Sequence, residues 1–133
     1  MTASDSKEVW TKPLDLALFN RLAPQTIHGP LGIEFTAYGP DWLEARMPVD
    51  ARTHQPAGLL HGGASVVLAE SLGSMAAIYS VGGDATKVVG IEINASHLRA
   101  VRSGYVTGRV TPVRLGRALQ VWEIRIRDEE DRP

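Results

Sequence analysis

The chain has 133 residues, of which 44% are hydrophobic and 22% are charged, and its formal net charge is -1 at pH 7. These values predict one globular domain over residues 1–133, and the small net charge argues against a nucleic-acid or anionic-membrane partner. The absence of cysteine excludes disulfides, thiol nucleophiles and cysteine-based metal sites. Because such a chain is compatible with a reducing compartment, we expect a cytoplasmic protein.

The first part of the chain combines a polar leader with a short helix. Residues 1–12 are expected to form the leader, and their polar, acid-containing start lacks the apolar core of a signal peptide. From Pro13, which is a suitable first helical residue, apolar side chains recur at helical spacing. Residues 13–22 are therefore predicted to form an amphipathic helix that ends near Pro24.

Five later segments have the alternation of apolar and polar residues that is typical of β-strands. They are residues 33–38, 42–49, 87–97, 104–113 and 119–127. The first two are predicted to pair as a hairpin across a turn that contains glycine and proline. The later strands follow one another through short joints, which favours an antiparallel sheet over alternating β-α-β units.

Residues 62–79 predict one long helix. The helix follows a polar, proline-interrupted loop at residues 50–56 and ends before the glycine pair at 82–83. Its length approaches that of a membrane span, but Gly, Ala and Ser are frequent in it and it carries Glu70, so a buried helix of a soluble domain fits better. The predicted fold class is α+β, with an antiparallel sheet wrapped around this long central helix.

Glu70 is the only formal charge between His61 and Asp84. A carboxylate in an apolar helix is costly to bury, so it is expected either to pair with a basic residue or to take part in chemistry. Desolvation would make such a carboxylate a more reactive base. From burial alone, the structural and the catalytic interpretations have about equal support.

Two motifs in this helix resemble those of a known family: HGGAS at residues 61–65 and AESLGS at residues 69–74. With them, the chain resembles the hotdog-fold acyl-CoA thioesterases of the phenylacetyl-CoA and 4-hydroxybenzoyl-CoA thioesterase type, and the similarity extends over almost the whole chain. Residues 44–50, 58–71 and 88–95 are particularly similar to a branch of that family. This branch includes 1,4-dihydroxy-2-naphthoyl-CoA hydrolases of menaquinone synthesis and proofreading thioesterases of enterobactin synthesis.

The resemblance implies a hotdog fold and hydrolysis of an acyl-CoA thioester to free acid and CoA. It also implies an aromatic or hydroxylated acyl group, with CoA as part of the substrate and no separate cofactor. Family members continue into a closing strand after the position of Pro133, and we expect that strand to be missing here. A homodimer or a dimer-of-dimers tetramer is expected, both from the resemblance and because a second copy would cover the open sheet edge.

Thioester hydrolysis requires an activated water and a stabilised oxyanion, whereas the thiolate leaves readily. Glu70 is predicted to act as general base or nucleophile, and the N–H of Gly62, at the helix start, is predicted to bind the oxyanion. Ser74 lies one turn after Glu70 and is either a water-orienting or a packing residue. Gln55 offers an amide donor for the thioester carbonyl unless it is an ordinary loop residue. His61 is assigned a supporting role, since a lone His before a helix is more often a capping residue than a catalyst.

Substrate binding is predicted for basic side chains that follow the long helix. Arg99, Arg102, Arg114 and Arg117 fall in the joints between the late strands, where they can meet the phosphates of CoA, although each is also an ordinary surface charge. The resemblance places His97 near the acyl or CoA site. No metal site is predicted, because the histidines have no recognised ligand spacing, and nucleotide-binding loops are also missing.

Alternatives to a thioesterase stay open. A non-catalytic acyl-CoA-binding or regulatory module would tolerate Glu70 without using it. A hydratase or dehydratase on the same fold is disfavoured because its His-Phe-Pro sequence is absent. The exact acyl group also stays open, because selectivity depends on the shape of the pocket. The sequence leaves open whether the thioester is to CoA or to a carrier protein. It also leaves open whether Glu70 activates water or forms an acyl-enzyme anhydride.

Overall fold

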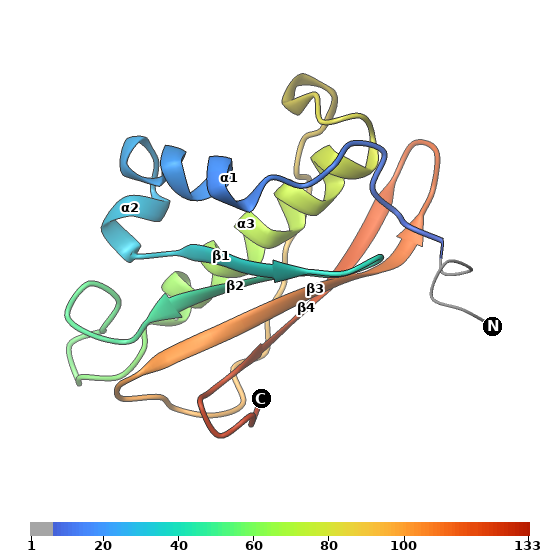
Figure 1. Ribbon diagram of the computed structural model, residues 1–133. Coiled ribbons are helices and arrows are strands. Elements are labelled where there is room, and N and C mark those ends of the chain that lie inside the picture. The colour runs from blue at the N-terminus through green and yellow to red at the C-terminus, as the bar shows by residue number, and fades with distance from the viewer. Residues whose placement is uncertain (1–6) are drawn as a thin grey trace.

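The computed structural model describes residues 7–133 (Figure 1). Its regular elements, in chain order, are α1 (Leu16–Leu22), the 3-10 turn η2 (Ala23–Gln25), α2 (His28–Leu31), β1 (Glu34–Tyr38), β2 (Leu43–Pro48), α3 (Gly62–Ser80), the 3-10 turn η3 (Ala85–Lys87), β3 (Tyr105–Leu115) and β4 (Gln120–Arg127). This arrangement confirms the α+β prediction of an antiparallel sheet with one long helix. No helix in the described part of the chain has the length and hydropathy needed to cross a membrane.

The four strands form one antiparallel sheet in the order β1-β2-β3-β4. Side chains alternate between its two faces, as the pleat of a strand requires. On the face toward the helix, Leu43, Met47 and Val110 are fully or almost fully buried. On the opposite face, the carboxylate of Glu44 pairs with Arg109 across the strands at 2.6 Å. The hairpin predicted from the first two strand segments is confirmed as β1 and β2.

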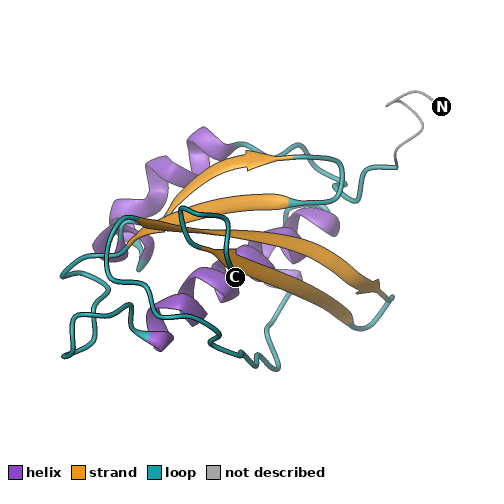
Figure 2. Cartoon of the chain, turned by 90° about the horizontal axis from the view of Figure 1, so that it is seen from below, coloured by secondary structure: helices purple, strands orange, loops and turns teal. Residues whose placement is uncertain are grey.

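Helix α3 packs across the apolar face of this sheet and contacts β2, β3 and β4 (Figures 1 and 2). Leu68, Leu72 and Ala76 recur every four residues and are completely buried, so they form the stripe that faces the sheet. One face of α3 is thereby fixed against the core. The residues midway between these positions point away from the sheet.

Of the leader predicted for residues 1–12, the structure describes residues 7–12, which pack against the domain, and residues 1–6 lie outside the described residues. The N–H of Val9 donates to the carbonyl of Pro40 and the N–H of Thr11 to that of Tyr79, each at 2.9 Å. Trp10 is only 9% exposed and stacks on Trp122, with ring centroids 6.3 Å apart. Burial of this large aromatic side chain holds the segment against the domain.

Helix α1 begins at Leu16 rather than at Pro13, because the side chain of Asp15 caps it by accepting from the N–H of Leu18 at 3.0 Å. The predicted end is confirmed, since α1 stops at Leu22 and a 3-10 turn containing Pro24 follows. The short helix α2 was not predicted. It brings His28 against the central helix.

The strand predicted for residues 87–97 is wrong, and the sheet formed by residues 7–133 has four strands instead of five. Residues 88–98 are extended but form no ladder with a described strand. Their apolar side chains are strongly exposed, with Val89 at 82% and Ile91 at 76%. An alternating sequence becomes a strand only when a neighbour supplies hydrogen bonds, and the described sheet ends at β4 without reaching this segment.

Candidate active site

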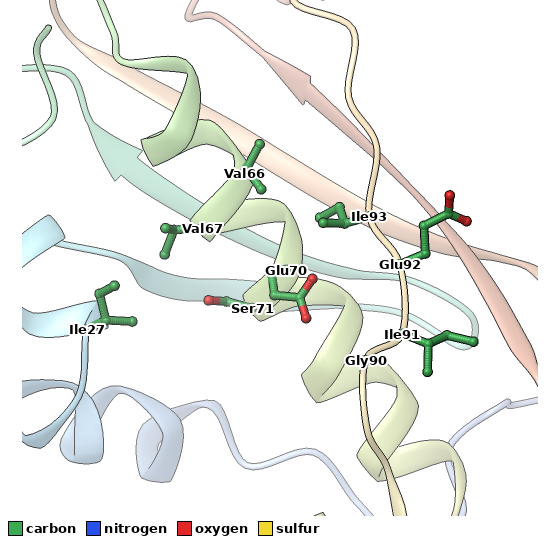
Figure 3. Close-up of a pocket in the computed structure, with 9 residues that line it drawn as sticks. All are labelled: Ile27, Val66, Val67, Glu70, Ser71, Gly90, Ile91, Glu92 and Ile93. Atoms are coloured by element: carbon green, nitrogen blue, oxygen red, sulfur yellow. The ribbon is translucent and has the colours of Figure 1, made fainter.

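An open cleft of about 600 Å³ lies between α3 and the extended segment that follows it (Figure 3). Most of its wall is aliphatic, and its polar groups come from a few side chains. The lining residues are Ile27, Val66, Val67, Glu70, Ser71, Gly90, Ile91, Glu92 and Ile93. An apolar recess with a few convergent polar groups is the common form of a small-molecule site.

Glu70 projects into this cleft from the middle of α3 (Figure 3). The side chain is exposed, so the predicted burial is wrong for this structure. The reason is its helical position: Glu70 stands midway between Leu68 and Leu72, which face the sheet, and therefore points to the uncovered side of α3. None of the ion pairs among residues 7–133 includes Glu70, so the interpretation as a paired structural acid has no support.

Gly90 lies directly against the Glu70 carboxylate. A Cβ atom added at residue 90 would stand only 2.9 Å from Oε1 of Glu70, so a larger residue would displace the carboxylate. Sequence reasoning missed Gly90, because a glycine within a predicted strand gives no sign of what lies opposite it. Ser74, one turn further along α3, is half-buried on the same side of the helix as Glu70.

The start of α3 is capped by His61, as one interpretation of the sequence predicted. Its Nδ1 accepts a hydrogen bond from the N–H of Gly63 at 2.8 Å, so the ring proton of the neutral imidazole is on Nε2. Gly62 is the first residue of the helix, where the N–H has no partner within the helix. The imidazole of His97 lies over Gly62, since a Cβ atom there would be 3.0 Å from Nε2 of His97.

Gln55 lies in a tight turn of the loop before α3. Its side-chain oxygen accepts from the N–H of Ala57, and its own N–H donates to the carbonyl of Leu59 at 2.8 Å. The side-chain NH₂ group is therefore available as a donor. Two further bonds tie this loop to the chain before β3: His54 Nε2 donates to the carbonyl of Arg102, and the N–H of Leu60 donates to that of Val101, both at 2.8 Å.

The structure does not bring the four arginines together. Arg99 and Arg102 precede β3 and are both exposed, and the carbonyl of Arg102 accepts from His54 in the loop that carries Gln55. Arg114 lies at the other end of β3 and Arg117 in the turn after it. Because the ends of β3 are ten residue steps apart, Tyr105 and Leu115 are separated by about 33 Å. Within one chain, His97 lies against Gly62 and Arg102 lies beside the loop before α3, whereas Arg114 lies at the far end of β3.

Sequence reasoning also missed a polar pair in the cleft wall. Ser71 is 9% exposed, and its Oγ is 2.8 Å from Nε2 of His28 at the start of α2. The His28 ring packs edge-on against Phe35, with centroids 5.6 Å apart, and burial lowers its pKa from 6.5. Ser71 follows Glu70 directly, but no spacing in the sequence connects it with a histidine 43 positions earlier.

Comparison with known proteins agrees with this geometry. Residues 57–133 match the family model of the thioesterase superfamily. The chain is 51% identical to the 1,4-dihydroxy-2-naphthoyl-CoA hydrolase of Escherichia coli, over 93% of this chain and 90% of the relative. It is 54% identical to the proofreading thioesterase EntH of Cronobacter turicensis, with the same coverage.

Solved structures give the same assignment. A mutant thioesterase from Pseudomonas aeruginosa superposes with a TM-score of 0.89 at 48% identity, covering 95% of this chain and 91% of the other. A thioesterase from Haemophilus influenzae superposes with a TM-score of 0.85 at 49% identity, covering 93% and 86%. These similarities confirm the hotdog fold expected from the sequence. The chain therefore belongs to the thioesterase superfamily and is a thioester hydrolase.

Proposed function

We propose that this thioesterase hydrolyses an acyl-CoA thioester with an aromatic or hydroxylated acyl group, and that Glu70 supplies the carboxylate for the reaction. The observation that carries the proposal is the position of Glu70, the only charged residue of α3. Its side chain lines an aliphatic cleft and forms none of the ion pairs among residues 7–133. The name of the Escherichia coli relative, a naphthoyl-CoA hydrolase, supports an aromatic CoA thioester.

In the simplest mechanism, Glu70 accepts a proton from water as the water oxygen attacks the thioester carbonyl. A C–O bond forms, and the carbonyl oxygen becomes an oxyanion that an N–H donor at the start of α3 stabilises. The C–S bond then breaks, and CoA leaves as a thiolate with the electron pair. The donors proposed to hold the carbonyl are the Gly62 N–H and the Gln55 side-chain amide.

Gly62 and Glu70 of one chain are too far apart to act on the same carbonyl. They are eight positions apart on one helix, which separates them by about 12 Å along its axis. The Gly62 N–H also points out of the helix end, away from Glu70. A reacting carbonyl needs both groups at about hydrogen-bond distance, roughly 3 Å. The proposal therefore includes a homodimer or dimer of dimers, in which Glu70 of one copy faces Gly62 of another.

An exposed apolar row beside the cleft supports this second copy. Val89, Ile91 and Leu98 are 82%, 76% and 72% exposed along the segment that borders Glu70. Such a row of aliphatic side chains is expected to be covered in the working assembly. A copy that packs on this segment would also exclude water from Glu70, which would strengthen the electrostatic interactions at the carbonyl.

The test is hydrolysis of benzoyl-CoA, followed by trapping the released thiol with a chromogenic reagent. The proposal expects catalytic release of CoA and a large loss of kcat in Glu70→Gln. Saturable binding of benzoyl-CoA without any release would instead support a non-catalytic acyl-CoA-binding module. Sedimentation should give a dimer or tetramer, and an active monomer at micromolar concentration would contradict the shared site.

A further inference from the structure

The cleft contains a second polar group that the proposed reaction does not use. Ser71 and Glu70 are neighbours on α3, so their side chains leave the helix about 100° apart. In Figure 3 the Glu70 carboxylate points toward the segment with Gly90 and Ile91, whereas the Ser71 hydroxyl points to the side on which Ile27 lies. One end of the cleft therefore carries the carboxylate and the other end carries the Ser71 hydroxyl.

His28 fixes the position of this hydroxyl. Its Nε2 is 2.8 Å from the Ser71 Oγ, and its ring packs edge-on against Phe35. The backbone of His28 is also anchored, because its carbonyl accepts from the N–H of Ile33 at 2.9 Å. Since burial lowers the pKa of His28, the imidazole is neutral near pH 7, and the pair as a whole carries no charge.

The rest of the cleft determines what this pair can bind. Its walls are aliphatic, and its charged lining residues within the described part of the chain are the acids Glu70 and Glu92. These two carboxylates would repel a negatively charged acyl group. A positively charged group would lose its hydration against the apolar side chains of Ile27 and Val67, which costs free energy. A neutral oxygen substituent is the group that a serine hydroxyl on an apolar wall accommodates best.

We infer that Ser71, held by His28, recognises a hydroxyl or carbonyl oxygen on the acyl group and makes the enzyme select oxygen-substituted over unsubstituted acyl chains. This inference rests on the proposed function, because it assigns the acyl group to the cleft beside Glu70. Ser71 acts as a specificity-determining residue that contacts substrate. His28 is a positioning residue that acts through Ser71.

The test compares benzoyl-CoA with its 2-, 3- and 4-hydroxy derivatives. The measured quantity is the ratio of kcat/KM for the best hydroxylated substrate to kcat/KM for benzoyl-CoA, which does not depend on how much of a preparation is folded. The wild type should prefer a hydroxylated substrate, and Ser71→Ala should lower that ratio about three- to tenfold, the range that the net strength of one neutral hydrogen bond accounts for. Ser80→Ala is the matched control, because Ser80 ends the same helix and bonds Ala77 and Gln120 instead. Its ratio should equal that of the wild type.

Two variants of His28 test the positioning role. His28→Leu removes the hydrogen bond and should lower the ratio as Ser71→Ala does. His28→Gln places an amide nitrogen at a similar reach and should restore the ratio, which a merely structural role for His28 does not predict. An unchanged ratio in Ser71→Ala, or no preference in the wild type, would overturn the inference and leave the proposed function intact. A wild type that cleaves none of these thioesters would overturn both.

Discussion

Replacing Gly62 by proline tests the oxyanion donor with little expected disturbance of the fold. Proline has no N–H, but it is well tolerated as the first residue of a helix, and Gly62 is the first residue of α3. The preceding residue also permits it, because His61 has φ -70° and ψ 130°, which suits a residue before proline. Loss of one oxyanion donor is expected to lower kcat roughly 10²–10³-fold.

Gly62→Ala is the matched control for this change. Alanine keeps the N–H. Its Cβ would lie 3.0 Å from the imidazole of His97, so it crowds the same ring that proline would crowd. The exposed His97 can shift by a few tenths of an ångström, so Gly62→Ala should retain most of the activity. A fall of kcat in alanine as large as in proline would show that crowding, and not the missing donor, causes the loss.

Mixing two inactive variants then tests whether the site is shared. If Glu70 and Gly62 of different copies form one site, a mixed dimer of Glu70→Gln and Gly62→Pro has one intact site and one site with both defects. Random reassociation in equal amounts should therefore restore about a quarter of the wild-type activity. This recovery is expected because Gly62 and Glu70 of one chain are separated by roughly 12 Å along α3 and cannot act on the same carbonyl. If the mixture stays as inactive as its components although mixed dimers are detected by mass, both groups act within one chain and the two-copy argument fails.

Three further changes have separate expected outcomes. Glu70→Gln should melt like the wild type while kcat falls roughly 10²–10⁴-fold, and turnover within a few-fold of the wild type would remove Glu70 from the mechanism. Arg102→Ala should raise KM for a CoA thioester with little change in kcat, because a contact to a remote phosphate binds ground and transition states alike; a fall in kcat at constant KM would contradict this. Hydrogen bonds from the side chain and the backbone N–H of Arg52 hold the pKa of Asp50 at about 2, below its ordinary 3.8. Asp50 therefore stabilises the fold above pH 3.8 and loses this contribution as pH falls toward 2. The difference in melting temperature between the wild type and Asp50→Asn should therefore shrink from pH 5 to pH 2, and a constant difference would show that ionisation of Asp50 is not responsible.

The sequence by itself determined the elements whose signals are local. The run from Gly62, whose one charge is Glu70, predicts α3 almost to the residue, since small and apolar side chains bounded by glycines favour a helix. The β1–β2 hairpin and the β3–β4 pair follow in the same way from alternation and short turns. Glu70 was found because a single charge in an apolar helix is conspicuous in the sequence itself.

Only the tertiary structure decided which of these elements meet. Residues 87–97 alternate like a strand, but a strand also needs a hydrogen-bonding neighbour, and the described sheet ends before reaching them. Glu70 is exposed because the sheet covers just one face of α3, which the composition of the helix does not reveal. Gly90 against its carboxylate, and His28 against Ser71, are contacts between distant parts of the chain. Such contacts depend on how helices and segments pack in three dimensions, and no local pattern encodes them.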